Sequence, residues 1–236
     1  MTLARVVFFA LCGAGGLGVV LLVMACGSAR ARDAPPQEDH SAHTGHSHDF
    51  ANADQSAAML DDPARDAWQR PDDVLRALAL APSMTVADVG AGTGYFAVRL
   101  ARAVPQGAVI ATDIEPDMVR YLEVRARREQ LPNLRAVSAS RTASGLAPNS
   151  VDAILVVDVW HHLDDRASYA RDLVAALRPG GRLIVVDFTT AARRGPPAHM
   201  RLAPETIIAE LTGAGLSARL SPIALPEQYI VEAEKL

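Results

Sequence analysis

Three glycines alternate with small residues directly after an apolar run, in the stretch VADVGAGTGYFAVRLA at residues 86–101. Gly90, Gly92 and Gly94 allow a sharp turn and a close approach of the backbone to a ligand. The helical pattern that follows would offer free N–H groups at its start. Asp88 lies two residues before Gly90, where the end of a strand would direct its carboxylate at the turn. The pattern indicates a ligand-binding loop between a strand and a helix.

A second carboxylate ends the next apolar run. Asp113, in IATDIEPDM, follows Gly94 by 19 residues. An acid at that point of a nucleotide-binding fold can accept hydrogen bonds from both hydroxyls of a ribose. A nicotinamide-cofactor fingerprint would require a third glycine at the position of Tyr95, so the spacing disfavours an NAD-dependent oxidoreductase.

Short apolar runs alternate with helical patterns along the rest of the chain, which predicts a mostly parallel sheet with helices on both faces. PDDVLRALAL at 71–80 has the spacing of one helix face, and Asp61-Asp62-Pro63 is typical of a helix start. The predicted strands are TVADVG (85–90), AVIATDI (108–114), LRAVSA (134–139), DAILVVDV (152–159) and RLIVVDF (182–188), with helices over 94–103, 116–130 and 164–178.

These motifs, taken in order, resemble the class I S-adenosylmethionine-dependent methyltransferases over about residues 70–236. VADVGAGTG is similar to the first motif of that family, and DIEPDM to the segment with its ribose-binding acid. NSVDAILVVDVWHHL is similar to the fourth strand and following loop of the quinone-biosynthesis type and related small-molecule enzymes, and LRPGGRLIVVDF to a late turn and strand. The resemblance implies a Rossmann-like α/β fold with seven strands, the last of which, near QYIVEAE, runs antiparallel.

The resemblance also implies which residues hold S-adenosylmethionine. Asp88 would hold the methionine ammonium, and its alternative role is that of a strand-end cap. Asp113 would take the ribose, with Ile114 against the adenine and Met118 as a neighbour. The expected cofactor residues are Asp88, Gly90, Ala91, Gly92, Thr93, Gly94, Asp113, Ile114, Met118 and Asp158.

One position departs from the family pattern. An acidic residue before the fourth strand commonly meets the adenine amino group, but this chain has Ser140, Arg141, Thr142 and Ala143 there. Losing a hydrogen bond to a carboxylate forfeits about 1.5–3 kcal/mol, which corresponds to roughly ten- to a hundredfold in affinity. Ser140 or Thr142 could supply a weaker contact.

The loop after the predicted fourth strand is expected to meet the methyl acceptor, because ligands bind at the carboxyl ends of strands in such sheets. Asp158, His161 and His162 are the candidate catalytic residues, as a base or as groups that orient the acceptor. The alternative is that both histidines only support the loop. Trp68 is a candidate lid with ordinary packing as its alternative, and Asp187 ends the next strand at the same edge.

The first residues predict export or anchoring. Residues 6–25 carry no charge after Arg5, and Val23-Met24-Ala25-Cys26 is similar to a bacterial lipobox. We therefore predict a signal peptide or anchor at 1–25, with Cys26 as a lipidation site; an uncleaved anchor and a misplaced start codon are the alternatives. Cys12 and Cys26 are the only cysteines, so a cleaved, acylated protein would have no free thiol.

Residues 26–58 are rich in Ala, Ser, Pro, Asp and His, which predicts a disordered tether ahead of a domain at 59–236. His40, His43, His46 and His48 could bind a metal weakly, or could be part of a solvated tether; no metal site is expected in the domain. A net charge of −4 gives no basis for binding nucleic acid.

The sequence therefore predicts a membrane-associated methyltransferase of a small-molecule or lipid-like acceptor. The alternative is a catalytically weakened lipoprotein of the same fold that binds a ligand or a metal. Neither the acceptor nor the oligomeric state follows from these residues.

Overall fold

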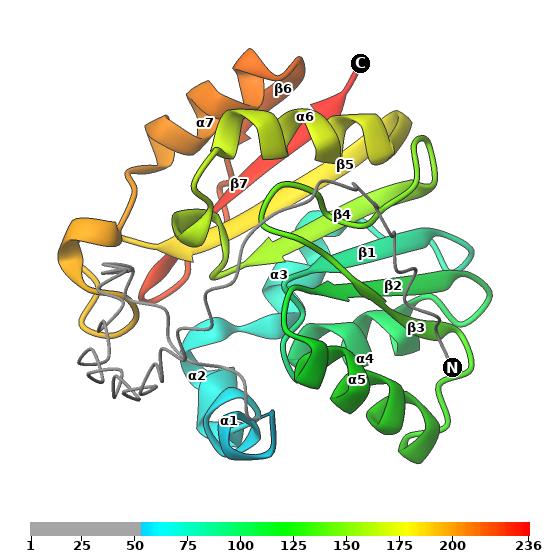
Figure 1. Ribbon diagram of the computed structural model, residues 1–236. Coiled ribbons are helices and arrows are strands. Elements are labelled where there is room, and N and C mark those ends of the chain that lie inside the picture. The colour runs from blue at the N-terminus through cyan, green and yellow to red at the C-terminus, as the bar shows by residue number, and fades with distance from the viewer. Residues whose placement is uncertain (1–52) are drawn as a thin grey trace, which may run out of the picture. The chain divides into compact units, whose positions relative to one another are not determined.

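A computed structural model describes residues 53–236 of the chain, in which seven strands form one sheet in the order β3-β2-β1-β4-β5-β7-β6 (Figure 1). Strands β1 to β5 are parallel, and β7 runs antiparallel to both β5 and β6. The predicted fold class and the antiparallel last strand are thus confirmed. The strands are β1 (Thr85–Val89), β2 (Ala108–Asp113), β3 (Leu134–Ser138), β4 (Val151–Val157), β5 (Leu177–Phe188), β6 (Leu216–Leu220) and β7 (Gln228–Lys235).

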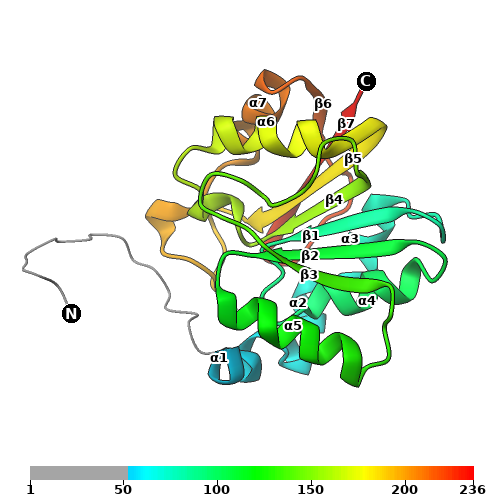
Figure 2. The ribbon, with the colours of Figure 1, turned by 45° about the vertical axis from the view of Figure 1, so that its right-hand side comes forward.

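Helices cover both faces of the sheet (Figures 1 and 2). One face packs against α3, α4 and α5, and the other against α6 and α7. Each face has its own buried cluster because the central strands are apolar on both sides, as parallel strands covered by helices require. The α-helices are α1 (Ala53–Leu60), α2 (Asp66–Gln69), α3 (Pro71–Leu78), α4 (Tyr95–Ala103), α5 (Pro116–Arg128), α6 (Arg166–Ala176) and α7 (Pro204–Gly213). The 3-10 turns are η1 (Pro63–Arg65), η2 (Trp160–His162) and η3 (Ala198–Met200).

Two boundaries differ from the sequence-based expectation. Strand β5 begins at Leu177, so the helix expected to run to 178 ends at Ala176; Leu177 pairs with Val151 across a register shift in β4. Helix α1 occupies Ala53–Leu60 and therefore crosses the boundary expected between tether and domain at 58/59. The domain boundary itself stays a prediction.

The strand order reverses between β1 and β4, since β2 and β3 lie to one side of β1 and β5, β7 and β6 lie beyond β4. Such a reversal opens a crevice at the carboxyl ends of the two central strands, where open α/β sheets bind ligands. The loop that begins at Gly90 leaves β1 at this crevice, and Asp158 leaves β4 there. The topology therefore brings the two candidate segments together.

The predicted signal peptide or anchor, the lipidation site Cys26 and the four tether histidines lie outside the described residues. Within residues 53–236, no helix is long and apolar enough to cross a membrane.

Candidate active site at the carboxyl ends of β1, β2 and β4

The loop after β1 is bound to β2 through its backbone. The amides of Gly90 and Ala91 both donate to the Thr112 carbonyl, at 2.8 and 2.9 Å. Gly90 has φ +72°, and a Cβ added to it would lie 2.3 Å from Val159 Cγ2 in the loop after β4. A side chain at this position would therefore both strain the backbone and separate the two loops. The glycine requirement predicted for this turn has a direct steric cause.

Asp88 is a buried carboxyl near the end of β1. Its residue is 3% exposed, and Oδ2 has no hydrogen-bond partner within the described part of the chain. Burial raises the pKa of Asp88 to about 7; Arg65 lowers it, and Asp113 raises it. A buried unpaired carboxylate is costly, so this oxygen would gain from an incoming cation such as an ammonium group. A backbone hydrogen bond from Ala97 in α4 also lowers the pKa of this carboxyl.

Asp113 ends β2 and faces the same loop. Its Oδ2 accepts a hydrogen bond from the Gly92 amide at 2.8 Å, and its Oδ1 accepts one from the Glu115 amide at 2.9 Å. Burial raises the pKa of this carboxyl, while these amides oppose the rise. Ile114 beside it is 43% exposed and offers an open apolar surface, whereas Met118 on α5 is buried in the core. The carboxylate is held rigidly and keeps further acceptor capacity for hydroxyl donors.

Asp158 follows β4 on the opposite side of the crevice. It has φ +60°, a left-handed conformation that is unfavourable for a residue with a side chain. Its Oδ1 accepts a hydrogen bond from Gln228 Nε2, and its Oδ2 lies 3.6 Å from Arg65 Nη2. Burial raises the pKa of Asp158 to about 7, Arg65 and His161 lower it, and Asp187 raises it. The backbone strain is held by tertiary contacts at this edge of the sheet.

The two candidate histidines have different environments. The His161 side chain is 2% exposed, and its Nδ1 lies 2.8 Å from Asp187 Oδ1, which also accepts from the Phe188 amide at 2.7 Å. His162 is exposed, with its ring centroid 4.1 Å from that of His161. The contact between this buried imidazole and the Asp187 carboxylate holds the loop after β4 against the end of β5, and the catalytic role of either histidine stays a prediction. His162 and Asp158 are the more open of the three candidate catalytic side chains.

The segment before the sheet supplies residues that the motifs did not identify. The Arg65 guanidinium lies 4.2 Å from the Tyr95 ring centroid, and its Nη1 donates to the Leu60 carbonyl at 2.9 Å. Asp61 accepts from Thr93 Oγ1 in the glycine loop at 3.1 Å and from Arg125 Nη1 at 2.8 Å. The charges of the stretch 61–70 were visible in the sequence, but nothing in their spacing shows which of them point inward.

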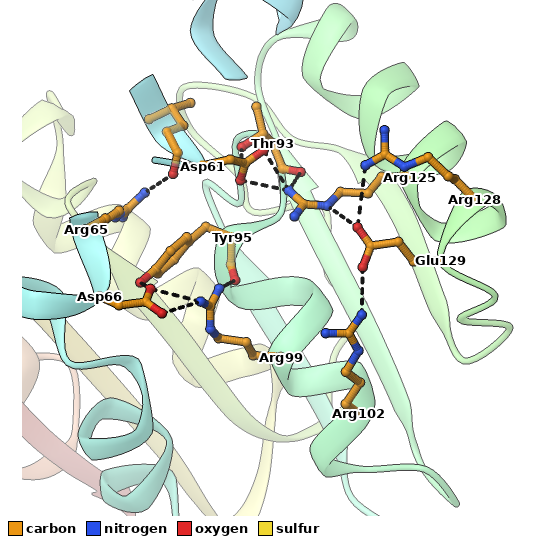
Figure 3. A network of polar contacts seen from close by, with 11 residues as sticks. Asp61, Arg65, Asp66, Thr93, Tyr95, Arg99, Arg102, Arg125, Arg128 and Glu129 are labelled. Atoms are coloured by element: carbon orange, nitrogen blue, oxygen red, sulfur yellow. Dashed lines mark hydrogen bonds and ion pairs between the residues drawn. The ribbon is translucent and has the colours of Figure 1, made fainter. Parts of the chain in front are cut away.

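Figure 3 shows how ion pairs fasten this segment to α4 and α5. Asp66 binds Arg99 Nη2 at 2.9 Å and accepts a hydrogen bond from the Tyr95 hydroxyl. Arg125 Nε bonds Glu129 at 2.9 Å. A cleft of about 290 Å³ lies among these side chains on the helical side of the molecule. The arginines that line this cleft already form ion pairs with carboxylates. The cleft therefore belongs to the structural contact between the segment before the sheet and the helices α4 and α5.

Trp68 closes over the end of β5. Its ring stacks on Phe188 with centroids 5.8 Å apart, and the Arg194 guanidinium lies 5.1 Å from the Trp68 centroid. A Cβ added to Gly195 would come within 2.7 Å of the Phe188 ring, so the loop backbone lies directly against that ring. Arg193 and Arg194 also lie 3.5 and 4.0 Å from Glu227 Oε1. Two segments far apart in sequence thus cover the same aromatic side chain.

The turn at 140–143 contains no carboxylate. Ser140 Oγ accepts hydrogen bonds from the amides of Ala143 at 3.0 Å and Thr142 at 3.3 Å, and it lies 3.4 Å from Thr142 Oγ1. The hydroxyl is therefore used by its own turn. Among the described residues there is also no cluster of three side chains suited to hold a metal ion.

Comparisons of the sequence and of the structure with known proteins both find methyltransferases. Residues 87–185 match a family model described as a methyltransferase domain. An uncharacterized methyltransferase of Mycobacterium tuberculosis (strain ATCC 25618 / H37Rv) is 37% identical over 126 residues, which are 53% of this chain and 48% of that protein. The ubiquinone/menaquinone biosynthesis C-methyltransferase of Pasteurella multocida (strain Pm70) is 31% identical over 106 residues, 44% of this chain and 40% of that protein.

The chain spans about half the length of these curated relatives. A solved structure covers more of it: a SAM-dependent methyltransferase from Aquifex aeolicus superposes with a TM-score of 0.71 at 26% identity, over 78% of this chain and 99% of that one.

Proposed function

We propose that this chain belongs to the class I S-adenosylmethionine-dependent methyltransferases and transfers a methyl group from S-adenosylmethionine to a small-molecule or lipid-like acceptor. The observation that carries the proposal is the buried Asp88 beside a loop built on glycines: its Oδ2 has no hydrogen-bond partner among residues 53–236. That oxygen suits the methionine ammonium of the cofactor. Asp113, held by the Gly92 amide, suits the ribose hydroxyls.

Methyl transfer from a sulfonium is an in-line displacement, and positioning of the two reactants can supply most of the catalysis. The residues of this chain contribute chiefly by orientation. The amides of the glycine loop fix the turn on β2, Ile114 offers an apolar surface, and Asp158 faces the crevice from β4. A base is needed only for an acceptor that must lose a proton, and Asp158 or His162 would then serve.

Support for a small or lipid-like acceptor comes from the relative whose printed name places it in quinone biosynthesis, and from the partly exposed Trp68, which stacks on the buried Phe188 beside Arg194. We further propose that the protein is membrane-associated through Cys26 or an uncleaved leader. Mass spectrometry of the mature N-terminus tests this: a diacylglyceryl-modified Cys26 supports it, and an unmodified Met1 in a soluble fraction refutes it.

Calorimetric titration of the full-length chain with S-adenosylmethionine tests the enzyme proposal. We expect saturable binding, and we expect Asp113→Ala to weaken it at least tenfold. Absence of binding at millimolar cofactor would refute the proposal. An unchanged affinity in Asp113→Ala would show instead that the ribose lies elsewhere.

The alternative, a weakened enzyme that only binds its ligand, is favoured by the turn at 140–143, where Ser140 bonds its own backbone and no carboxylate is present. Transfer of radiolabel from methyl-labelled cofactor to a prenylated quinol or a phenol separates the two. Labelled product requires an active enzyme, whereas binding without product from any acceptor in such a panel favours the alternative.

A further inference from the structure

Four side chains from three distant parts of the chain form a closed ring at the crevice. Arg65 Nε donates to Gln69 Oε1 at 3.0 Å, and Gln69 Nε2 donates to Gln228 Oε1 at 2.5 Å. Gln228 Nε2 then donates to Asp158 Oδ1. Asp158 Oδ2 lies 3.6 Å from Arg65 Nη2, and this ion pair closes the ring. Gln69 is fully buried and Gln228 is 2% exposed.

The direction of this ring is fixed by its chemistry. A guanidinium can only donate hydrogen bonds, so Gln69 must present its oxygen to Arg65 and its nitrogen to Gln228. Because Gln228 accepts the hydrogen bond from Gln69 through its oxygen, it must present its nitrogen to Asp158. The carboxylate of Asp158 is the one member that only accepts. The ring therefore favours the ionised form of Asp158, against the burial that raises its pKa, and it selects a single orientation for each buried carboxamide.

The ring also connects the two sides of the candidate site. The charge of Arg65 lowers the pKa of both Asp88 and Asp158, and its Nη2 lies 3.6 Å from Asp158 Oδ2. Arg65 belongs to the segment before the sheet, and that segment also reaches the glycine loop through Asp61 and Thr93. Asp158 needs outside support, because its left-handed backbone is unfavourable by itself.

We propose that Gln69 and Gln228 are positioning residues, which hold Arg65 and Asp158 in register across the crevice so that the cofactor site is complete only when the segment 61–70 is docked on the sheet. This inference rests on the proposed function. Neither glutamine needs to touch the cofactor; each acts through the charged residue it binds. Loss of either would free the charged residue that it binds to reorient, and would thereby weaken cofactor binding.

Leucine substitutions separate positioning from simple stabilisation. Gln69→Leu and Gln228→Leu each leave one buried carboxamide without its partner, which lowers the unfolding temperature. The double variant removes both carboxamides, so its unfolding temperature should recover above that predicted by adding the two single losses. The affinity for S-adenosylhomocysteine, measured by calorimetry on the full-length chain, should stay at least tenfold weaker in the double variant. Gln106→Leu, at an exposed position away from the site, is the matched control and should leave the affinity unchanged.

Gln228→Glu gives a second readout, because glutamate lacks the N–H that Asp158 accepts. Two carboxylates would then face each other, with Arg65, His161 and Asp187 as the other charged or titratable neighbours of Asp158. The loss of affinity relative to wild type should be larger at pH 8, where both acids are ionised, than at pH 6. A merely structural role would give an equal loss at the two pH values.

The outcomes are distinct. A wild-type chain that does not bind S-adenosylhomocysteine at millimolar concentration refutes the proposed function and this inference with it. A wild type that binds, together with a double variant of equal affinity, refutes the inference alone.

Discussion

The substitution Asp88→Asn should stabilise the ligand-free protein at alkaline pH while it weakens cofactor binding. Asp88 is 3% exposed and one of its oxygens has no partner among the described residues, so its ionised form is poorly solvated. Asparagine has nearly the same shape and never ionises. The cost of keeping a charge in this position therefore disappears in the variant.

The size of the effect follows from the pKa of Asp88, which burial raises from 3.8 to about 7. Each pKa unit corresponds to about 1.4 kcal/mol, so the ionised carboxyl costs the folded state up to about 4 kcal/mol above neutral pH. Because folding raises the pKa of Asp88, the folded chain holds the proton on this carboxyl between pH 4 and 7, while the unfolded chain does not. Stability contributed by the protonated form is present below pH 4 and is lost as pH rises through 7.

The assay is thermal unfolding of the full-length wild type and variant at pH 4 and at pH 8, without ligand. The stability of the variant relative to the wild type should rise by about 4 kcal/mol from pH 4 to pH 8, which corresponds to about 10 °C in unfolding temperature for a domain of this size. Calorimetry at pH 8 should show at least tenfold weaker binding of S-adenosylmethionine. A difference between variant and wild type that is equal at both pH values would refute the burial argument, and unchanged binding would refute the ammonium role.

Three further outcomes are expected. The affinity of the wild type for S-adenosylhomocysteine should rise with pH and level off above about 7, since protonated Asp88 cannot attract an ammonium; a flat profile between pH 6 and 8 in calorimetry would contradict this. Gly90→Ala should lower stability by about 2 kcal/mol in urea unfolding, because its Cβ meets Val159 at 2.3 Å and φ is positive, whereas Gly213→Ala, with nothing within 4 Å, should be neutral or stabilising. His161→Leu should cost about 3 kcal/mol by the same measurement because it removes the imidazole that bonds the buried Asp187 and leaves Asp187 Oδ1 with the Phe188 amide. An unchanged urea midpoint would show that the contact between His161 and Asp187 contributes nothing.

Local pattern was sufficient for much of the fold. Apolar runs of strand length separated by helical periodicity predicted β1 to β5 and the helices between them, because a buried parallel strand must be apolar on both faces. The glycine loop could also be predicted from the sequence, because the positive φ values at Gly90, Gly92 and Gly94 favour glycine at these positions. The start of β5 could not be predicted in this way, because residues 178–181 (Arg-Pro-Gly-Gly) lie within β5 but lack the apolar pattern of a buried strand.

The candidate site could also be predicted only in part from the sequence. The positions of Asp88, Asp113 and Asp158 followed from the sequence, because each ends a strand and the carboxyl ends of parallel strands meet at one edge. Which histidine would be buried did not follow: His161 and His162 are adjacent, and only the packing against Asp187 distinguishes them.

The sequence by itself determined the class of fold, the glycine loop and the acids around it, since these depend on residue type and short spacing. Only the tertiary structure decided that Arg65 and Gln69, from the segment before the sheet, meet Gln228 near the end of the chain. The physical reason is that a hydrogen bond between residues 159 positions apart leaves no periodic trace in the sequence. It exists because the antiparallel β7 returns its first residue to the crevice at which β4 ends.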